Sequence, residues 1–154
     1  MLPKDASVVN PYIWIIACLP FLPGVLMLTW HLEVRTYTRN GILTLDPATI
    51  FSTGYFLIWG GLVFTYCSTV VLARFDTRRL VQSGVVRPFH WAWSFLGGIP
   101  YVIGRIVVTH KVAPRRGLWP LVVIFSAWGL YYVAGTIKSL AFMRAAFDQL
   151  GYPA

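Results

Sequence analysis

Four long stretches of this sequence carry almost no charge, and they constrain its fold more than any other feature. Three of them contain no Asp, Glu, Lys or Arg, and the one between Phe89 and Thr109 contains only Arg105. A helix needs about 20 apolar residues to cross the ~30 Å hydrocarbon core of a bilayer. We therefore expect four transmembrane helices. Their predicted spans are 10–30, 47–73 with the helix continuing to about 83, 89–109, and 118–140 with the helix continuing to about 150.

The composition leaves little material for a water-soluble domain. Of the 154 residues, 57% are apolar and 12% are charged, whereas about 25% of the residues of a soluble domain are charged. So few charged residues do not cover a water-facing surface. The sequence therefore predicts an all-α membrane protein in which residues 1–154 form a single integral membrane domain, a bundle of four transmembrane helices.

The chain is strongly basic, with 13 Lys and Arg against 5 Asp and Glu and a net charge of +8. The basic residues lie beside and between the apolar stretches, where topology signals and contacts with anionic headgroups occur. No nucleic-acid-binding motif interrupts these stretches, so we expect no nucleic-acid partner. The residues predicted to contact headgroups or an acidic partner are Arg74, Arg78, Arg79, Arg87, Arg105, Lys111, Arg115 and Arg116.

A short segment between the first two apolar stretches has the pattern of a β-hairpin. Asn40-Gly41 is a strong signal for a two-residue turn of type I′, because both residues tolerate a positive φ. Residues 34–46 are rich in Thr, Tyr, Ile and Leu. We predict a small hairpin at the membrane surface, with Arg39 facing Ile42. Asp46-Pro47 is then expected to cap and open the second helix, and Gly84 to follow its last turn.

Small residues recur along two of the predicted helices. In lipid, a stripe of small side chains lets helix backbones approach closely. We expect these stripes to serve packing within the chain rather than homodimerisation. The predicted helix-packing residues are Gly54, Gly61 and Ser68 in the second helix and Gly135 and Ser139 in the fourth.

Proline and glycine predict two breaks. Pro20 removes a backbone donor in the first span, so we expect a kink there. Gly97-Gly98-Ile99-Pro100 interrupts the third span near its middle. That span is long enough for one full crossing, which we predict, but its two halves would also suit a re-entrant hairpin.

The positive-inside rule bears on this choice. Four crossings place both termini on the same, cytoplasmic side, with seven basic residues inside and six outside. A re-entrant third span gives nine inside and four outside. The charge distribution therefore favours the hairpin, whereas helix length favours the crossing.

Few residues suggest chemistry. No ionisable residue is predicted at the membrane midplane, which argues against proton-coupled transport. His31 and His110 are weak candidates for axial haem ligands. Cys18 and Cys67 lie within apolar spans without a C-x-x-C spacing, and no catalytic motif is present. We expect no enzyme activity, no cofactor and no metal site.

One region resembles a known group of proteins. The run Asp76–Leu96, with Tyr101–Val108 and Arg116–Leu121, is similar to a segment of small multi-span bacterial membrane proteins. The resemblance covers about residues 76–121. It implies a membrane location and a bacterial source, and it carries no activity or ligand.

These observations favour an accessory or scaffold subunit that acts through helix packing and surface contacts in a larger membrane complex. The expected location is the bacterial cytoplasmic (inner) membrane, and the expected partners are anionic lipid and other membrane subunits. An oligomeric channel or small-solute carrier is the first alternative. A haem-bearing electron-transfer subunit is the second.

Overall fold

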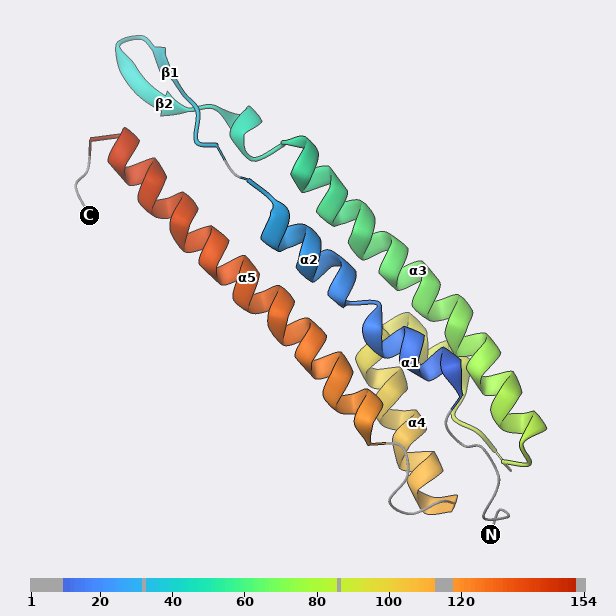
Figure 1. The fold of residues 1–154 in the computed structure, drawn as a ribbon. Coiled ribbons are helices and arrows are strands. Elements are labelled where there is room, and N and C mark those ends of the chain that lie inside the picture. The colour runs from blue at the N-terminus through green and yellow to red at the C-terminus, as the bar shows by residue number, and fades with distance from the viewer. Residues whose placement is uncertain (1–9, 32, 86, 113–117, 152–154) are drawn as a thin grey trace.

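A computed structural model describes residues 10–31, 33–85, 87–112 and 118–151. Figure 1 shows long helices lying side by side, with a β-hairpin projecting at one end and a short helix packed at the other. The elements in chain order are α1 (Pro11–Cys18), α2 (Phe21–Thr29), β1 (Thr36–Arg39), β2 (Ile42–Leu45), the 3-10 helix η1 (Pro47–Thr49), α3 (Thr53–Gln82), the 3-10 helix η2 (Trp91–Leu96), α4 (Gly98–Val112) and α5 (Trp119–Gln149).

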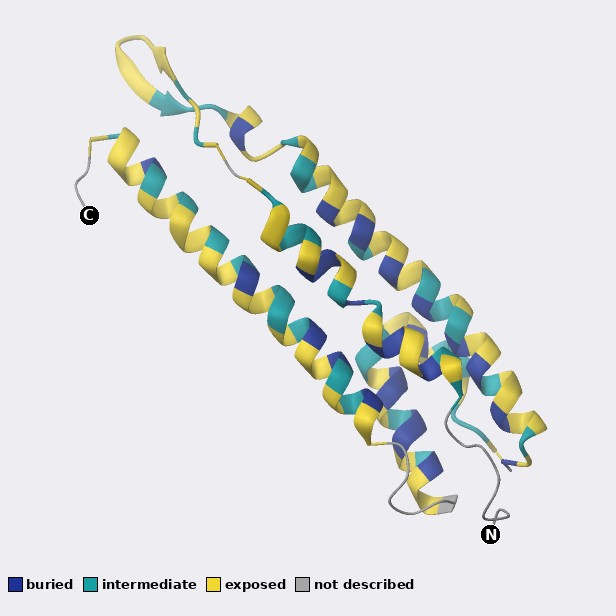
Figure 2. Ribbon diagram, in the orientation of Figure 1, coloured by how far each residue is buried: buried dark blue, intermediate teal, exposed yellow. Residues whose placement is uncertain are grey.

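Three helical stretches in the described ranges are long and apolar enough to cross a membrane. They are Pro11–Thr29, which comprises α1 and α2, Thr53–Gln82 and Trp119–Gln149. Their exposed residues face outward and their buried residues face one another (Figure 2). Three of the four apolar stretches thus form helices of crossing length, as predicted.

The first of these stretches is kinked where the sequence predicts it. Leu19 and Pro20 separate α1 from α2, because proline has no amide to continue the helical hydrogen bonds. The Thr65 hydroxyl of α3 donates to the Leu19 carbonyl at 3.4 Å. The Leu19 carbonyl also accepts from the Leu22 amide at 3.1 Å, so the neighbouring helix adds a second hydrogen bond at the break.

The predicted β-hairpin is confirmed. Arg39 pairs with Ile42 and Tyr37 with Thr44 in an antiparallel register. The turn residues Asn40 and Gly41 have φ values of 53° and 77°, as a type I′ turn requires. The hairpin lies beyond the ends of the helices (Figure 1).

The predicted start of the second helix is wrong. Asp46 does cap a helical turn, since its Oδ1 accepts from the Ala48 amide at 2.9 Å, but that turn is only η1. The long helix α3 begins later, at Thr53, where the Ser52 side chain accepts from the Tyr55 amide. Its C-terminal end agrees with the prediction, because Gly84 follows the last turn with φ 83°.

The predicted third crossing is also wrong in its form. Instead of one continuous helix over 89–109, the chain forms η2, turns at Gly97 with φ 110°, and continues as the 15-residue helix α4. Glycine tolerates this φ because it has no Cβ. The two halves of the third apolar stretch therefore run in opposite directions, as in the hairpin that the sequence allows as the alternative to a full crossing.

Contacts with α3 show the depth that this segment reaches. The Phe89 carbonyl accepts from Thr77, and the Phe95 carbonyl accepts from Tyr66 at 3.1 Å. The returning helix then meets α3 in reverse order. Tyr101 donates to the Ala73 carbonyl, and Val108 packs against Leu80. The segment η2–α4 therefore enters from the end where α3 finishes, reaches about half the length of α3, and returns to the same end.

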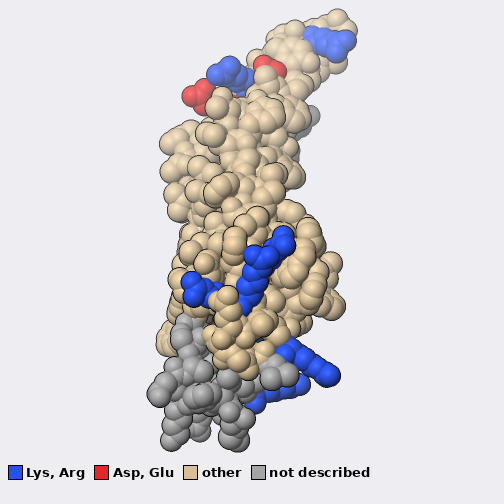
Figure 3. All heavy atoms as spheres, turned by 90° about the vertical axis from the view of Figure 1, so that its right-hand side faces the viewer, with Lys and Arg blue, Asp and Glu red and all other residues tan. Residues whose placement is uncertain are grey.

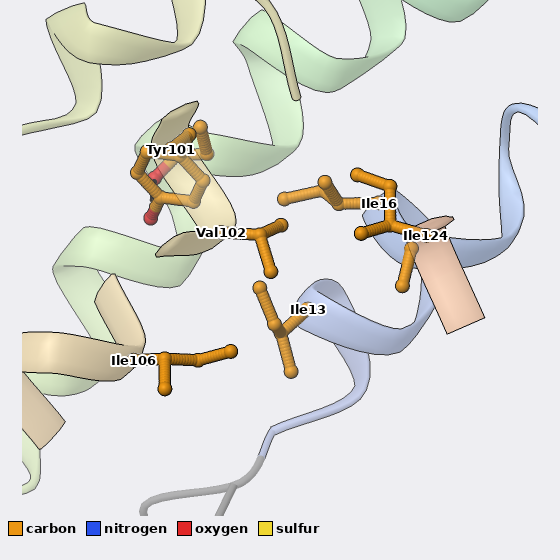
Figure 4. Packing of buried hydrophobic residues seen from close by; sticks show 8 residues of the cluster. Ile13, Ile16, Tyr101, Val102, Ile106 and Ile124 are labelled. Atoms are coloured by element: carbon orange, nitrogen blue, oxygen red, sulfur yellow. Dashed lines mark hydrogen bonds between the residues drawn. The ribbon is translucent and has the colours of Figure 1, made fainter. Parts of the chain in front are cut away.

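The hydrophobic core lies where the doubled-back segment η2–α4 meets the other helices. Figure 4 shows Val102 of α4 pointing toward Ile13 and Ile16 of α1, with Ile124 of α5 beside them. All four side chains are fully buried. The kinked first stretch thus packs on α4 near the N-terminal end of α1.

The doubled-back segment changes the predicted topology. Three long stretches, rather than four, run along the molecule, so residues 10 and 151 lie at opposite ends (Figure 1). The structure therefore does not support the expectation that both termini share one side. We call the end with β1 and β2 the hairpin end and the end where α3 and α4 finish the basic end.

Candidate functional site

A buried ion pair joins the returning helix α4 to α3. Arg105 Nε lies 2.7 Å from Asp76 Oδ2, and Arg105 Nη2 lies 3.1 Å from Asp76 Oδ1. The side chains are 1% and 0% exposed. Two parallel N–H···O bonds of this kind fix the orientation as well as the distance of the partners.

Two hydroxyl groups extend this pair into a network. Tyr101 Oη lies 2.7 Å from Asp76 Oδ2 and 3.1 Å from the Ala73 carbonyl oxygen. Thr77 Oγ1 lies 2.9 Å from the Ala73 carbonyl oxygen, 3.3 Å from the Phe89 carbonyl oxygen and 3.3 Å from Tyr101 Oη. The network therefore connects α3 both to the entry of the doubled-back segment at Phe89 and to its return at Tyr101.

The network fixes how far the doubled-back segment reaches along α3. A buried charge without a partner is strongly unfavourable. Here each buried charge lies beside the opposite charge of its partner, because Arg105 is paired with Asp76. Arg74 adds an outer contact, because its guanidinium carbon lies 5.8 Å from the centre of the Trp91 ring in η2. This geometry suits a positioning role. The Asp76 carboxylate is fully buried within the network.

Sequence reasoning missed this pair. Asp76 precedes Arg78 and Arg79 in the sequence, and a carboxylate within such a basic cluster gives no local sign of a buried partner 29 residues later. One signal was available. The buried residues of α3 recur at Gly61, Thr65, Thr69, Ala73, Asp76 and Leu80, so the stripe of small residues continues directly into Asp76.

Arg105 requires a correction, because it was predicted to contact headgroups and is instead buried against Asp76. Five other basic residues that were predicted to contact headgroups lie exposed at or near the basic end, whereas Arg35, Arg39, Lys138 and Arg144 lie toward the hairpin end. In Figure 3, Lys and Arg side chains without visible acidic neighbours lie on that part of the face, whereas both basic and acidic groups are visible near the hairpin end. These exposed residues are Arg74, Arg78, Arg79, Arg87 and Lys111; Arg115 and Arg116 lie outside the described residues.

The small residues lie against neighbouring helices of the same chain. A Cβ added at Gly54 would collide with the Trp30 ring, and one added at Gly61 would lie 2.8 Å from Leu26 Cδ1. Ser68 is half-buried. On α5, Gly135 faces Met27, and Ser139 lines a shallow depression with the same Met27. Gly54 and Gly61 of the stripe on α3 thus lie against α2 and the residue that follows it.

The two histidines considered as haem ligands lie at opposite ends of the molecule. His31 lies beside Ser52 and Thr53 at the start of α3, whereas His110 follows Val108, which packs near the end of α3. Because α3 has 30 residues, about 45 Å separate its ends. His31 and His110 are therefore too far apart to ligate the same haem. No group of three or more metal-ligating side chains occurs among the described residues.

The two predicted breaks meet at one cavity. Pro20 from the kink and Gly97–Pro100 from the turn both line a space of about 350 Å³, together with side chains of α3 and α5. The cavity lies about halfway along α3, since Leu62 and Thr69 are among its lining residues.

Comparison with protein-family models, curated proteins and solved structures finds no significant match to this chain. The resemblance over residues 76–121 therefore stays a prediction.

Proposed function

We propose that this chain is an integral protein of the bacterial cytoplasmic membrane. Three helices cross the bilayer, and the segment η2–α4 enters and leaves on the side of the basic end. The exposed apolar side chains around the middle of the bundle support this placement, because water disfavours a continuous belt of such residues. They include Phe56, Phe64, Val71, Phe125, Val133 and Ile137.

The basic end faces the cytoplasm in this proposal. Five exposed basic residues lie there, and the nearest acidic residue in the described ranges, Asp76, is buried in an ion pair. An excess of Lys and Arg next to transmembrane segments is typical of the cytoplasmic side. The exposed Arg and Lys side chains there contact anionic headgroups. The hairpin then lies on the opposite face of the membrane.

The function we propose is that of a non-catalytic accessory or scaffold subunit in a larger membrane complex. The hairpin carries this proposal. It projects beyond the helices (Figure 1), and Ile42, Leu43 and Tyr37 are 69%, 42% and 40% exposed. A two-stranded hairpin is marginally stable alone in water. Its apolar side chains and open strand edges suit a β-strand or apolar surface of a partner subunit.

The test replaces Ile42, which is the most exposed apolar residue of the two strands. The chain is extracted from the membranes of its own host in a mild detergent, and the particle mass and protein content are measured. We expect the unaltered chain to run with a second protein and Ile42→Glu to run without it. Ile50→Glu is the matched control, since Ile50 is 45% exposed near the same end but lies outside the strands.

Two outcomes contradict the proposal. One is a strict monomer, or a particle built from this chain alone, when the unaltered protein is extracted. The other is an assembly that survives Ile42→Glu as well as it survives Ile50→Glu, because the hairpin would then make no contribution to the contact.

A further inference from the structure

The cavity at the turn between η2 and α4 has the size and position of a small-molecule site. Its volume is about 350 Å³, within the range of about 300–1,000 Å³ that is typical of ligand pockets. It is lined by residues from every crossing stretch as well as from the doubled-back segment. This inference is independent of the accessory-subunit proposal, which rests on the hairpin at the far end of α3.

One buried side chain in the cavity has an unused donor. Thr69 is only 4% exposed and lines the cavity. Its hydroxyl makes no hydrogen bond within the described part of the chain, whereas Thr65 and Thr77 on the same helix each donate to a carbonyl. Thr69 Cγ2 and Oγ1 lie 3.5 Å and 3.9 Å from the place that a Cβ at Gly98 would take, so the Thr69 side chain lies against the start of α4.

The start of α4 supplies further donors at the same place. The amides of Gly98 and Ile99 lie in the first turn of α4, where no carbonyl of the same helix can accept a hydrogen bond from them. Neither amide donates a hydrogen bond to another described residue. Pro100 follows and has no amide. In a membrane interior, water does not readily satisfy such groups, so an unpaired donor there is costly.

The rest of the lining is apolar and aromatic. Phe95, Trp128 and Tyr132 surround the donors. A matching ligand therefore has an apolar, preferably flat body and one strong acceptor, with no need for a charge. A carbonyl oxygen is such an acceptor, and it pairs with a hydroxyl and with backbone amides.

We propose that this cavity binds the carbonyl-bearing end of a lipophilic molecule, with the carbonyl oxygen accepting from Thr69 Oγ1 and from the first amides of α4. Two sources share this chemistry, a quinone head group and the acyl ester of a lipid. The experiment distinguishes them by using one probe of each kind and a third probe that lacks the carbonyl.

The test measures quenching of tryptophan fluorescence in lipid nanodiscs that hold the full chain. Decylubiquinone is titrated, and the part of the quenching that disappears in Trp128→Phe is taken as binding at the cavity. Methyl decanoate and decylbenzene are then added as competitors. We expect saturable quenching that decylbenzene does not relieve. The membrane content of methyl decanoate that relieves half of the quenching is compared with the membrane content of decylubiquinone that gives half-saturation. If methyl decanoate needs the lower content, the carbonyl is assigned to a lipid ester. If decylubiquinone needs the lower content, the carbonyl is assigned to a quinone.

Variants of Thr69 test the donor itself. Thr69→Val keeps the shape and removes the hydroxyl, so half-saturation should shift about fivefold, the loss expected for one hydrogen bond. Thr69→Ser keeps the hydroxyl and should stay within about twofold. Thr136→Val is the matched control, because that hydroxyl on α5 is exposed and bonds to its own helix. If Thr69→Val fails to fold, Thr69→Ala and Thr69→Ser form a second pair that differs mainly in the hydroxyl.

Three results overturn the inference: quenching that rises linearly without saturation, competition by decylbenzene equal to that by methyl decanoate, or equal half-saturation for the variants with and without the Thr69 hydroxyl. None of these results affects the hairpin experiment, because Ile42 lies at the far end of the molecule.

Discussion

Arg105 Nε lies 2.7 Å from Oδ2 of Asp76, 29 residues earlier in the chain, and both side chains are withdrawn from the surface. This pair joins α3 to the returning arm of the doubled-back segment. Together with the Tyr101 hydroxyl it sets how far that segment penetrates between the other helices. The stability of the doubled-back arrangement should therefore depend on the pair.

Removing one partner of this pair should destabilise the fold. Asp76→Asn leaves Arg105 buried beside a neutral group, and the loss expected for an uncompensated buried charge is about 3–5 kcal/mol in the free energy of unfolding. Titration of the detergent-solubilised protein with SDS, followed by circular dichroism, measures this change. Arg79→Gln is the control, since Arg79 is an exposed charge on the same helix and its loss should cost less than about 1 kcal/mol.

Replacing both partners gives the complementary test. Asp76→Leu combined with Arg105→Met fills the space with apolar atoms and leaves no orphan charge, so the double variant should unfold nearer to the original protein than Asp76→Asn does. A double variant as unstable as the single one would show that the network has a role beyond neutralising its own charges.

Gly104 allows close contact between the two arms of the doubled-back segment. A Cβ at this position would collide with the Phe89 ring, so Gly104→Ala should cost about 1–3 kcal/mol through overpacking. Gly60→Ala is the matched control, because nothing lies within 4 Å of its added Cβ. The same SDS titration measures both variants, and an equal response of the two would contradict the packing described here.

The doubled-back segment also predicts which residues share a side of the membrane. In a background without Cys18 and Cys67, single cysteines at Arg87 and Lys111 should be labelled by an impermeant maleimide from the same side. Cysteines at Arg39 and Asp148 should be labelled from the other side. All four positions are exposed in the structure. Labelling at Lys111 together with Arg39 would mean that the segment crosses, and the re-entrant geometry would then be wrong.

Lys138 holds the end of α2 against α5. Its Nζ donates to the Trp30 carbonyl, which follows α2, at 2.6 Å. A hydrogen bond from a charged group is worth about 1.5–3 kcal/mol, so Lys138→Met should lower the free energy of unfolding by about this amount. Arg144→Met serves for comparison, because Arg144 is exposed one to two turns further along the same helix. Equal effects of the two substitutions would exclude a specific role for this bond.

Local patterns predicted the elements whose structure depends on neighbours in sequence. Asn40-Gly41 specified the hairpin and its register, Pro20 specified the kink, and Gly84 marked the end of α3. Each depends on the φ angles or the missing donor of one or two residues. The start of α3 failed for a related reason, since Asp46 caps a short turn as readily as a long helix.

The sequence by itself determined that this protein is built from long apolar helices with a β-hairpin and an excess of positive charge, because hydropathy, charge and turn propensity are properties of contiguous residues. Only the tertiary structure decided that the third apolar stretch doubles back, that Asp76 meets Arg105 and that the kink at Pro20 and the turn at Gly97 line one cavity. These features bring together residues far apart along the chain. Their energies depend on which helix faces are neighbours, and neither segment specifies that alone.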